Sequence, residues 1–393
     1  MLRDVAEVVR GVEVTMIPES LIQESGEPTL PRRRPTCYTS MYVLLSVTKG
    51  KTMWWIEEGD SAQVLKVLPT ASIDALVTDP PAGISFMGAN WDGSKGGRDK
   101  WIAWLAGILT ECRRVMKPGA YGWVWALPRT SHWTGTACED AGFSVRDVMT
   151  HVFGTGFPKS RALLKPAAEH WILIKAPGEL RELRIEENRI GTTKQVPASA
   201  PQAANAIYGA RPISALDENT SGYDPNSGRW PANFALTHSD DCGDLCADGC
   251  PVKELDRQSG VRESRESGYD FKPSRNDNPS RVTTNIKSGI HFGDTGTASR
   301  FFYVAKPSSS ERSAGLDDRN AHPTVKSIGL MRHLVRLIAK PGDLVLDPFT
   351  GSGTTGLAAI EEGCRFVGIE REPHFADIAR QRLTHHSRQG RLF

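Results

Sequence analysis

The ten residues Asp347–Gly356 read DPFTGSGTTG and follow a short apolar segment that is typical of a buried strand. A helical pattern begins at Thr354, so the glycines lie in a turn between a strand and a helix. Because glycine has no Cβ, the backbone of such a turn can approach a ligand closely. The next strand, Arg365–Ile369, ends before Glu370, which lies 19 residues after Gly351. A carboxylate at this distance commonly binds ribose hydroxyls, so the stretch predicts a ribose-bearing ligand.

The same glycines also fit the spacing of a dinucleotide-binding turn. That fold needs a second mononucleotide-binding half, but only 40 residues follow Gly353. A loop for nucleoside triphosphates is excluded, because no lysine follows the glycines in the required position. The rest of the sheet must therefore come from earlier in the chain, and we favour a methyl donor over a dinucleotide as the ligand.

Strands and helices alternate between residues 51 and 178, which predicts an α/β sheet domain. The expected elements there are a buried strand at Ser72–Thr78, a helix at Trp101–Met116, and strands at Gly122–Leu127 and His170–Ile174. Between 179 and 300, glycine, serine, proline and mixed charges dominate, and only Asn233–Leu236 resembles a strand. We therefore predict one sheet domain assembled from 51–178 and 301–393, with 179–300 as an inserted irregular lobe and 1–50 as a flexible extension.

Bulk properties constrain the class of protein only loosely. The 393 residues carry a formal net charge of +2, so any DNA-binding surface must be a local patch. No apolar stretch is long enough to span a bilayer, and the N-terminus lacks the order of a signal peptide. Seven cysteines without an export signal indicate reduced thiols. We expect a cytoplasmic protein without a membrane partner.

A second motif, Asp79-Pro80-Pro81, ends the buried strand, where α/β sheets place their ligands. An amino group on a heteroaromatic ring is a poor nucleophile, because its lone pair is delocalised. The Asp79 carboxylate and the Pro80 carbonyl could each accept one N–H and so favour a pyramidal nitrogen. They would also stabilise charge that develops as the nitrogen attacks a sulfonium methyl group, while Pro81 stiffens the turn. In isolation a simple turn is the plainer interpretation, but the glycine turn favours the catalytic one.

Together the two motifs resemble the signature of DNA amino-methyltransferases, in the permuted β arrangement that places the catalytic tetrapeptide first. Further similar pieces are Gly59-Asp60, His322–Lys326 and three segments that resemble a phage-type branch, namely Asp79–Gly88, Gly154–Ser160 and Arg229–Asn233. The resemblance covers about Asp60–Arg380. It implies a Rossmann-like methyltransferase fold, a twisted and mainly parallel sheet with flanking helices. It also implies S-adenosyl-L-methionine as cofactor and double-stranded DNA with a flipped-out target base.

The resemblance also implies roles for single residues. Asp79 and Pro80 would grip the amino group, and Glu370 would hold the cofactor ribose. Lys326 would lie near the amino-acid end of the cofactor, and Asp60 would face the cofactor or the base. The other cofactor-binding residues would be Asp347, Phe349, Gly351, Gly353 and Thr354. Such an enzyme would act in restriction–modification, in a bacterial or phage-infected host cell.

One departure from the family pattern concerns the base. An aromatic residue usually follows the two prolines and stacks on the flipped base, but here that position is Ala82. Base–aromatic stacking contributes about 1–3 kcal/mol, so another ring must substitute or binding is weaker. Phe86 and Trp91 are the nearest candidates, although either could be a core residue.

The target base follows from the family's tendencies. Aspartate at the first motif position favours adenine N6, because cytosine-N4 members more often have serine. The sequence disfavours methylation at cytosine C5, because that reaction uses a cysteine nucleophile, which in that family follows a proline, and no cysteine here has that position. The alternatives are cytosine N4, methylation of RNA or a protein amide, and a weakly active or inactive DNA-binding homologue. Recognition site, oligomeric state and partner nuclease cannot be predicted.

The inserted lobe contains a possible metal site. His238, Cys242, Cys246 and Cys250 recur at every fourth position, and four such ligands in a lobe with little core could bind structural zinc. Free thiols and a surface histidine are the alternative. Basic residues nearby suit phosphate contacts, although acidic residues are interleaved with them: Arg257, Arg262, Arg265, Lys272, Arg275 and Arg281. By elimination the lobe is the best place for sequence recognition.

Overall fold

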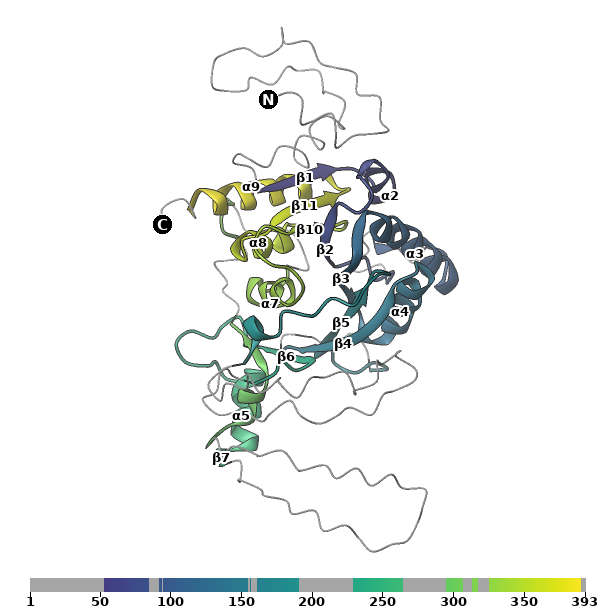
Figure 1. Cartoon of the computed structure of the whole chain (residues 1–393). Coiled ribbons are helices and arrows are strands. Elements are labelled where there is room, and N and C mark those ends of the chain that lie inside the picture. Colours follow the sequence, from purple (N-terminus) through teal and green to yellow (C-terminus); the bar gives the residue numbers. More distant parts are fainter. Residues whose placement is uncertain are drawn as a thin grey trace, which may run out of the picture. The chain divides into compact units, whose positions relative to one another are not determined.

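The central sheet of this computed structural model has nine strands, in the order β1-β11-β10-β2-β3-β5-β4-β6-β9 (Figure 1). Neighbouring strands run parallel except at β5, which is antiparallel to both β3 and β4. The strands are β1 (Trp54–Glu58), β2 (Ile73–Thr78), β3 (Met116–Ala126), β4 (Ser144–Val152), β5 (Ala168–Lys175), β6 (Phe234–Thr237), β9 (Tyr303–Ala305), β10 (Leu344–Asp347) and β11 (Arg365–Glu370). The structure describes residues 53–84, 92–93, 95–154, 156, 161–190, 229–263, 295–306, 313–316 and 325–389.

Helices cover both faces of this sheet. One layer contains α7 (Ile328–Ile338), α8 (Thr354–Glu361) and α9 (Pro373–Gln389), and the other contains α3 (Arg98–Val115) and α4 (Ser131–Asp140) (Figure 1). Side chains of α7, α8 and α9 share one large hydrophobic core with the strands. Strand β2 is buried along almost its whole length, as expected for a parallel strand between two helical layers. The Rossmann-like α/β fold with a mainly parallel sheet is therefore confirmed.

The site is positioned by a reversal of chain direction across the sheet. From β2 the chain passes through α3 to β3 on one side, whereas from β10 it passes through α8 to β11 on the other. Strands β2 and β10 are neighbours and parallel, so their carboxyl ends meet at one edge. Ligands of open α/β sheets bind at such a point, because the connections diverge and leave a crevice.

The sheet is larger than the sequence predicts. Strands β1 and β4 were not expected, and β3 begins at Met116 rather than at Gly122. The register of β4 against β5 shifts between Val145 and Asp147, which breaks the alternation that would reveal a strand. In β3 the Pro118-Gly119 pair looks like a helix stop, but the strand tolerates it where the pairing with β2 is irregular.

The first residues of the predicted lobe contact the sheet domain. Residues 179–190, which include the 3₁₀ helix η6 (Glu186–Asn188), pack on the sheet domain. Leu183 and Ile185 contact its core, and Arg184 Nη1 donates to the Ala339 carbonyl at 2.6 Å, at the end of α7. Strand β6 lies within the predicted lobe as well, but it pairs with β4 in the main sheet.

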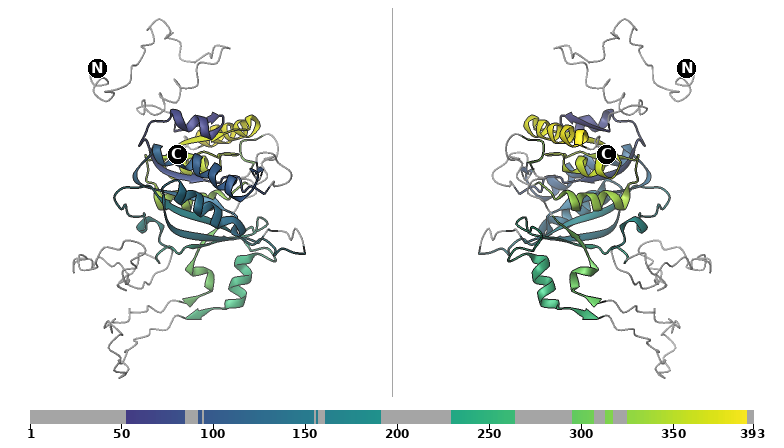
Figure 2. Two further views of the ribbon diagram at one scale, coloured as in Figure 1. Left: turned by 90° about the vertical axis from the view of Figure 1, so that its right-hand side faces the viewer. Right: turned by 90° about the vertical axis from the view of Figure 1, so that its left-hand side faces the viewer.

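The structure describes only part of the remaining lobe. It contains the loop after β6, helix α5 (Pro251–Ser259), the pair β7 (Arg262–Glu263) and β8 (Thr295–Gly296), and the 3₁₀ helix η9 (Ala298–Phe301). Figure 2 shows α5 beyond the β6–β9 edge of the sheet. Of the α5 side chains only Val252 is buried. Among the described residues, no helix has the length and apolar character that a membrane span requires.

Candidate functional site

A cavity of about 610 Å³ lies at the carboxyl ends of β2, β10 and β11. The residues predicted for the cofactor and for catalysis line it, with the exception of Gly353. Its lining also includes side chains from β4, β5 and β6, which the sequence did not single out: His151, Glu169 and Thr237. One cavity therefore contains both the glycine turn and the Asp79 motif.

The glycine turn is held in place by Glu370 and by its own backbone. Gly351 and Gly353 have φ values of +53° and +82°, which side chains rarely adopt. The Glu370 carboxylate accepts hydrogen bonds from the backbone N–H groups of Gly351 at 2.8 Å and Glu372 at 2.9 Å. Burial raises the pKa of Glu370. Gly353 is the N-cap of α8 and approaches Ala379 of α9, which explains why it lies behind the turn rather than in the cavity wall.

Asp347 stabilises the glycine turn through hydrogen bonds. Its carboxylate accepts hydrogen bonds from Thr355 Oγ1 at 2.6 Å, Thr78 Oγ1 at 2.8 Å and the Phe349 backbone N–H at 3.0 Å. Asp347 is only 1% exposed, and burial raises its pKa to about 7. Because Thr78 directly precedes the Asp79 motif, this carboxylate joins the two predicted motifs.

Asp79 lies beside a buried cation. The Lys326 ammonium is 3.2 Å from Asp79 Oδ2 and 3.0 Å from Glu169 Oε2. Burial raises the pKa of Asp79 to about 6, although Lys326 acts in the opposite direction. Burial would lower the pKa of Lys326, but the two carboxylates outweigh it and raise that pKa. Lys326 thus contacts the Asp79 motif directly.

Glu169 is the centre of a buried network. Besides Lys326, it accepts a hydrogen bond from Trp125 Nε1 at 2.7 Å and pairs with His151 Nδ1 at 2.9 Å. The other ring nitrogen of His151 hydrogen-bonds the Thr237 hydroxyl, at the end of β6. Burial disfavours the charged form of Glu169, but Lys326 and the hydrogen bonds hold its pKa well below its usual range. The sequence feature that could have identified Glu169 is a carboxylate directly before the predicted apolar strand His170–Ile174.

The chain after Pro81 is fixed by another carboxylate that sequence reasoning missed. Asp92, which is 1% exposed, accepts the Gly83 backbone N–H at 2.7 Å. Ala82 lines the cavity, but Phe86 and Trp91 lie outside the described residues. The described aromatic side chains in the cavity wall are Trp104, Trp125, Phe153, Phe349 and Phe375. Rings other than the two predicted ones are therefore available to a bound base or cofactor.

Asp60 has a local structural role as well as a place in the cavity wall. It is the N-cap of the short helix α2 (Ser61–Val64), and its side chain accepts the Ala62 backbone N–H at 2.8 Å.

The glycine turn has a further support in the last helix. The buried Arg382 of α9 donates to the Ser352 carbonyl at 2.6 Å. An arginine in the last helix gives no sequence signal of this role.

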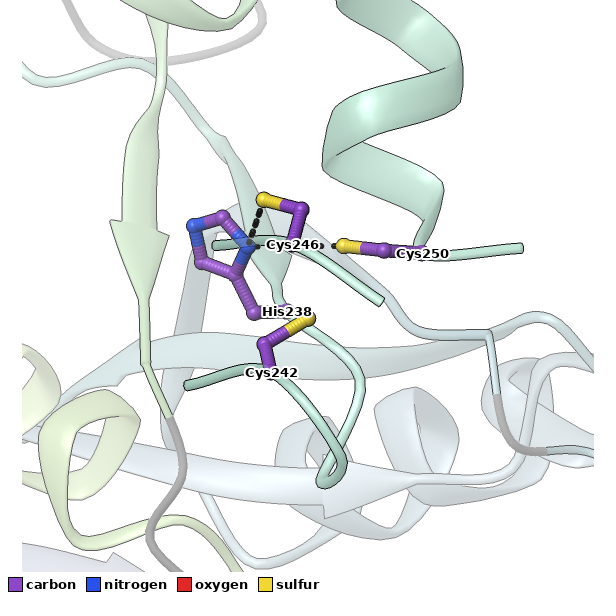
Figure 3. A group of neighbouring side chains, drawn as sticks. All are labelled: His238, Cys242, Cys246 and Cys250. Atoms are coloured by element: carbon purple, nitrogen blue, oxygen red, sulfur yellow. Dashed lines mark hydrogen bonds between the residues drawn. The ribbon is translucent and has the colours of Figure 1, made fainter. Parts of the chain in front are cut away.

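The four predicted metal ligands converge in space, and one of them, His238, lines the cavity. One possible ligand atom of each of His238, Cys242, Cys246 and Cys250 lies within 4.8 Å of all the others. In Figure 3 the imidazole faces the sulfurs of Cys246 and Cys250, each 3.4 Å from Nδ1. Of the basic residues predicted nearby, Arg257 pairs with Glu254, Arg262 is exposed, and the others lie outside the described residues.

Proteins similar to this chain include two sequence relatives and one solved structure. The type II methyltransferase M.HinfI of Haemophilus influenzae is 34% identical over 103 residues, 26% of this chain and 29% of that protein. The type II methyltransferase M2.DpnII of Streptococcus pneumoniae is 48% identical over 62 residues, 16% of this chain and 23% of that protein. The chain thus matches less than a third of either relative's length. The PvuII DNA methyltransferase (cytosine-N4-specific) superimposes with a TM-score of 0.48 at 14% identity, covering 86% of this chain and 93% of that one.

A family model with the description "DNA methylase" matches residues 73–381. The match begins at β2, ends in α9, and includes both the Asp79 motif and the glycine turn. It covers well over half of the chain, so this protein belongs to the N6_N4_Mtase family of DNA methylases.

Proposed function

We propose that this protein is an S-adenosylmethionine-dependent DNA methyltransferase that acts on the exocyclic amino group of a flipped base, with adenine N6 as the favoured target. The observation that carries the proposal is the single cavity that contains both the glycine turn with Glu370 and the Asp79–Pro80 pair. A donor and an acceptor of a methyl group must be held next to each other, which such a shared space permits.

The residues present fit this cofactor. A cavity of about 610 Å³ is of the size that cofactor sites have. Glu370 can offer carboxylate oxygens to ribose hydroxyls, and the partly exposed Phe349 offers a ring face to an adenine. When bound, S-adenosylmethionine supplies an electrophilic methyl group on a sulfonium. Burial raises the pKa values of Asp347 and Glu370, so a cationic ligand beside these two carboxyl groups would favour their ionised forms.

The chemistry of the chain itself centres on Asp79. As a carboxylate it can accept one amino N–H of the base, while the Pro80 carbonyl accepts the other, and so hold the nitrogen lone pair out of the ring plane. Burial raises the pKa of Asp79, and Lys326 opposes this shift and so favours the ionised form. Glu169 in turn fixes the Lys326 ammonium at 3.0 Å.

The proposal also includes the base that is methylated and the biological role of the enzyme. Aspartate rather than serine at the first motif position supports adenine N6 over cytosine N4. Ala82, in place of an aromatic residue, supports weaker base binding and keeps a weakly active DNA-binding homologue as the second candidate. We place recognition of double-stranded DNA in the lobe, and we assign the enzyme to restriction–modification.

The decisive test is methyl transfer from labelled S-adenosylmethionine to unmethylated genomic DNA, followed by nucleoside mass spectrometry. We expect N6-methyladenine, and a loss of roughly 10²–10⁴-fold in rate for Asp79→Ala, with binding of S-adenosylmethionine retained. N4-methylcytosine would leave the mechanism intact and correct the target. Cofactor binding without any methylated base would overturn the enzymatic proposal in favour of the DNA-binding homologue.

A further inference from the structure

We propose that His238, Cys242, Cys246 and Cys250 bind one structural zinc ion that anchors the lobe at the rim of the cavity. The four ligand atoms come from a stretch of thirteen residues and lie within 4.8 Å of one another. Three thiols and one imidazole are a common donor set of structural zinc. This inference does not depend on the proposed methyltransferase activity.

The distances fit a tetrahedral ion. Zn–S bonds of about 2.3 Å and Zn–N bonds of about 2.0 Å place neighbouring ligand atoms roughly 3.5–3.8 Å apart. The observed separation of 3.4 Å between His238 Nδ1 and the sulfurs of Cys246 and Cys250 is close to that value. Figure 3 shows the Cys242 side chain on another side of the same small space. All four positions around an ion would be filled by protein, which indicates a structural rather than a catalytic site.

The local backbone prepares these groups for a metal. Gly249, with φ of +74°, turns the chain so that Cys250 returns to the cluster, and Cys250 is the N-cap of α5. The Ala247 backbone N–H donates to Cys242 Sγ at 3.3 Å. Such N–H···S contacts, together with the positive end of a helix dipole, stabilise thiolates that bind metal.

The described part of the lobe has little apolar core of its own. Its separate hydrophobic cluster has four buried members, Leu236, Cys242, Cys250 and Val252, so two of the proposed ligands form half of it. Of α5, only Val252 is buried. Small units with so little core commonly depend on a metal or on disulfides, and the described cysteines are free.

A metal ion at this position would also affect the wall of the cavity. His238 lines the cavity and directly follows Thr237, whose hydroxyl contacts His151. A metal bound to His238 would therefore fix the end of β6, and with it the outer partner of the Glu169 network. The lobe and the catalytic motif would share one rigid wall.

The test is to measure the metal content of the purified full chain by elemental mass spectrometry. The chain should carry no affinity tag. We expect about one zinc per chain. Replacement by Co²⁺ should give the intense visible absorption of a tetrahedral site and a thiolate-to-metal charge-transfer band. Cys250→Ala should reduce the zinc content by roughly tenfold.

Cys138→Ala is the matched control, because Cys138 of α4 is as fully buried as Cys250 and lies outside the cluster. It should keep its zinc. Since Cys250→Ala could fail to fold, Cys246→Ala, at a partly exposed position, provides a second variant with the same expected loss. Absence of zinc from the wild-type chain, iron in its place, or full zinc retention in both cluster variants would overturn the proposal.

Discussion

Two strand–loop–helix units of this protein, β10–turn–α8 and β6–loop–α5, face one cavity but are stabilised differently. In the first, the turn is held by Glu370, Asp347 and Arg382, and most of α8 is buried in the large core. In the second, α5 buries one side chain, and the loop brings together one histidine and three cysteines. A loop that packs on a large core can be held by hydrogen bonds alone. A loop that packs on a small hydrophobic cluster needs a further cross-link, such as the proposed metal ion.

The Glu169 network connects the second unit with β2, whose Thr78 hydrogen-bonds Asp347 of the first unit. Through Lys326 it reaches Asp79 at the carboxyl end of β2, and through His151 it reaches Thr237 at the end of β6. The two units should therefore respond differently to four changes. These are loss of Glu169, removal of the proposed zinc ion, substitution of a glycine in either loop, and removal of a single charge beside Asp79.

The largest effect is expected for Glu169→Ala. It would leave Lys326 and His151 buried without their shared partner, and loss of one member of a buried ion pair costs about 3–5 kcal/mol. Urea unfolding measures the loss of stability. Glu187→Ala is the control, because Glu187 forms an exposed pair with Arg184 that contributes at most about 1 kcal/mol. Similar losses for the two variants would show that the network does not hold the units together.

Removal of the proposed zinc ion should affect one unit only. After chelation, amide hydrogen exchange should speed up by roughly tenfold or more in α5 and in the loop that precedes it, because their small core is insufficient alone. Protection in β10 and α8 should not change, since the large core holds them. Equal deprotection of α5 and α8 would mean that the two units unfold together.

A pair of glycine substitutions compares the loops directly. Gly353→Ala combines a φ of +82° with a Cβ only 3.0 Å from the Ala379 Cβ, so we expect a loss of about 2–3 kcal/mol. Gly249→Ala has a φ of +74° but nothing within 4 Å, so we expect about 1 kcal/mol. Thermal unfolding of both variants with zinc present checks the order. A larger loss for Gly249→Ala would contradict the packing of the turn against α9.

The sequence predicts the first unit much better than the second. Glycines, a terminal carboxylate and apolar strands are local signals, so β10, α8, β11 and β2 were all located. Strand β4 was missed because a bulge interrupts its alternation. In the lobe, residues at every fourth position suggested ligands, but their convergence depends on a backbone path that composition does not determine.

The site shows the same limit. Asp79 and Asp347 lie at strand ends, where pattern and chemistry coincide. Glu169, His151 and Asp92 act through partners that are distant in sequence, such as the Glu169–Lys326 contact across 157 positions. No single-sequence pattern reports such contacts. The base-stacking role of Phe86 and Trp91, the phage-type branch and the individual cofactor contacts stay predictions.

The smallest effect is a change in pH dependence. Asp79 must be ionised to accept an amino hydrogen, and its pKa is raised to about 6, so the rate of the free enzyme should rise with pH through about pH 6. Lys326→Met removes a cation that lowers this pKa, which should move the acid limb to higher pH. Glu169→Gln removes an anion that raises it, which should move the limb to lower pH. The opposite signs separate electrostatic control of Asp79 from a mere loss of structure, because misfolding would lower the rate without moving the limb in two directions. Measurement of kcat/KM for methyl transfer between about pH 5 and pH 8.5 decides the matter, with shifts on the order of one unit expected. Equal shifts in the same direction would remove Lys326 and Glu169 from any control of the catalytic carboxylate.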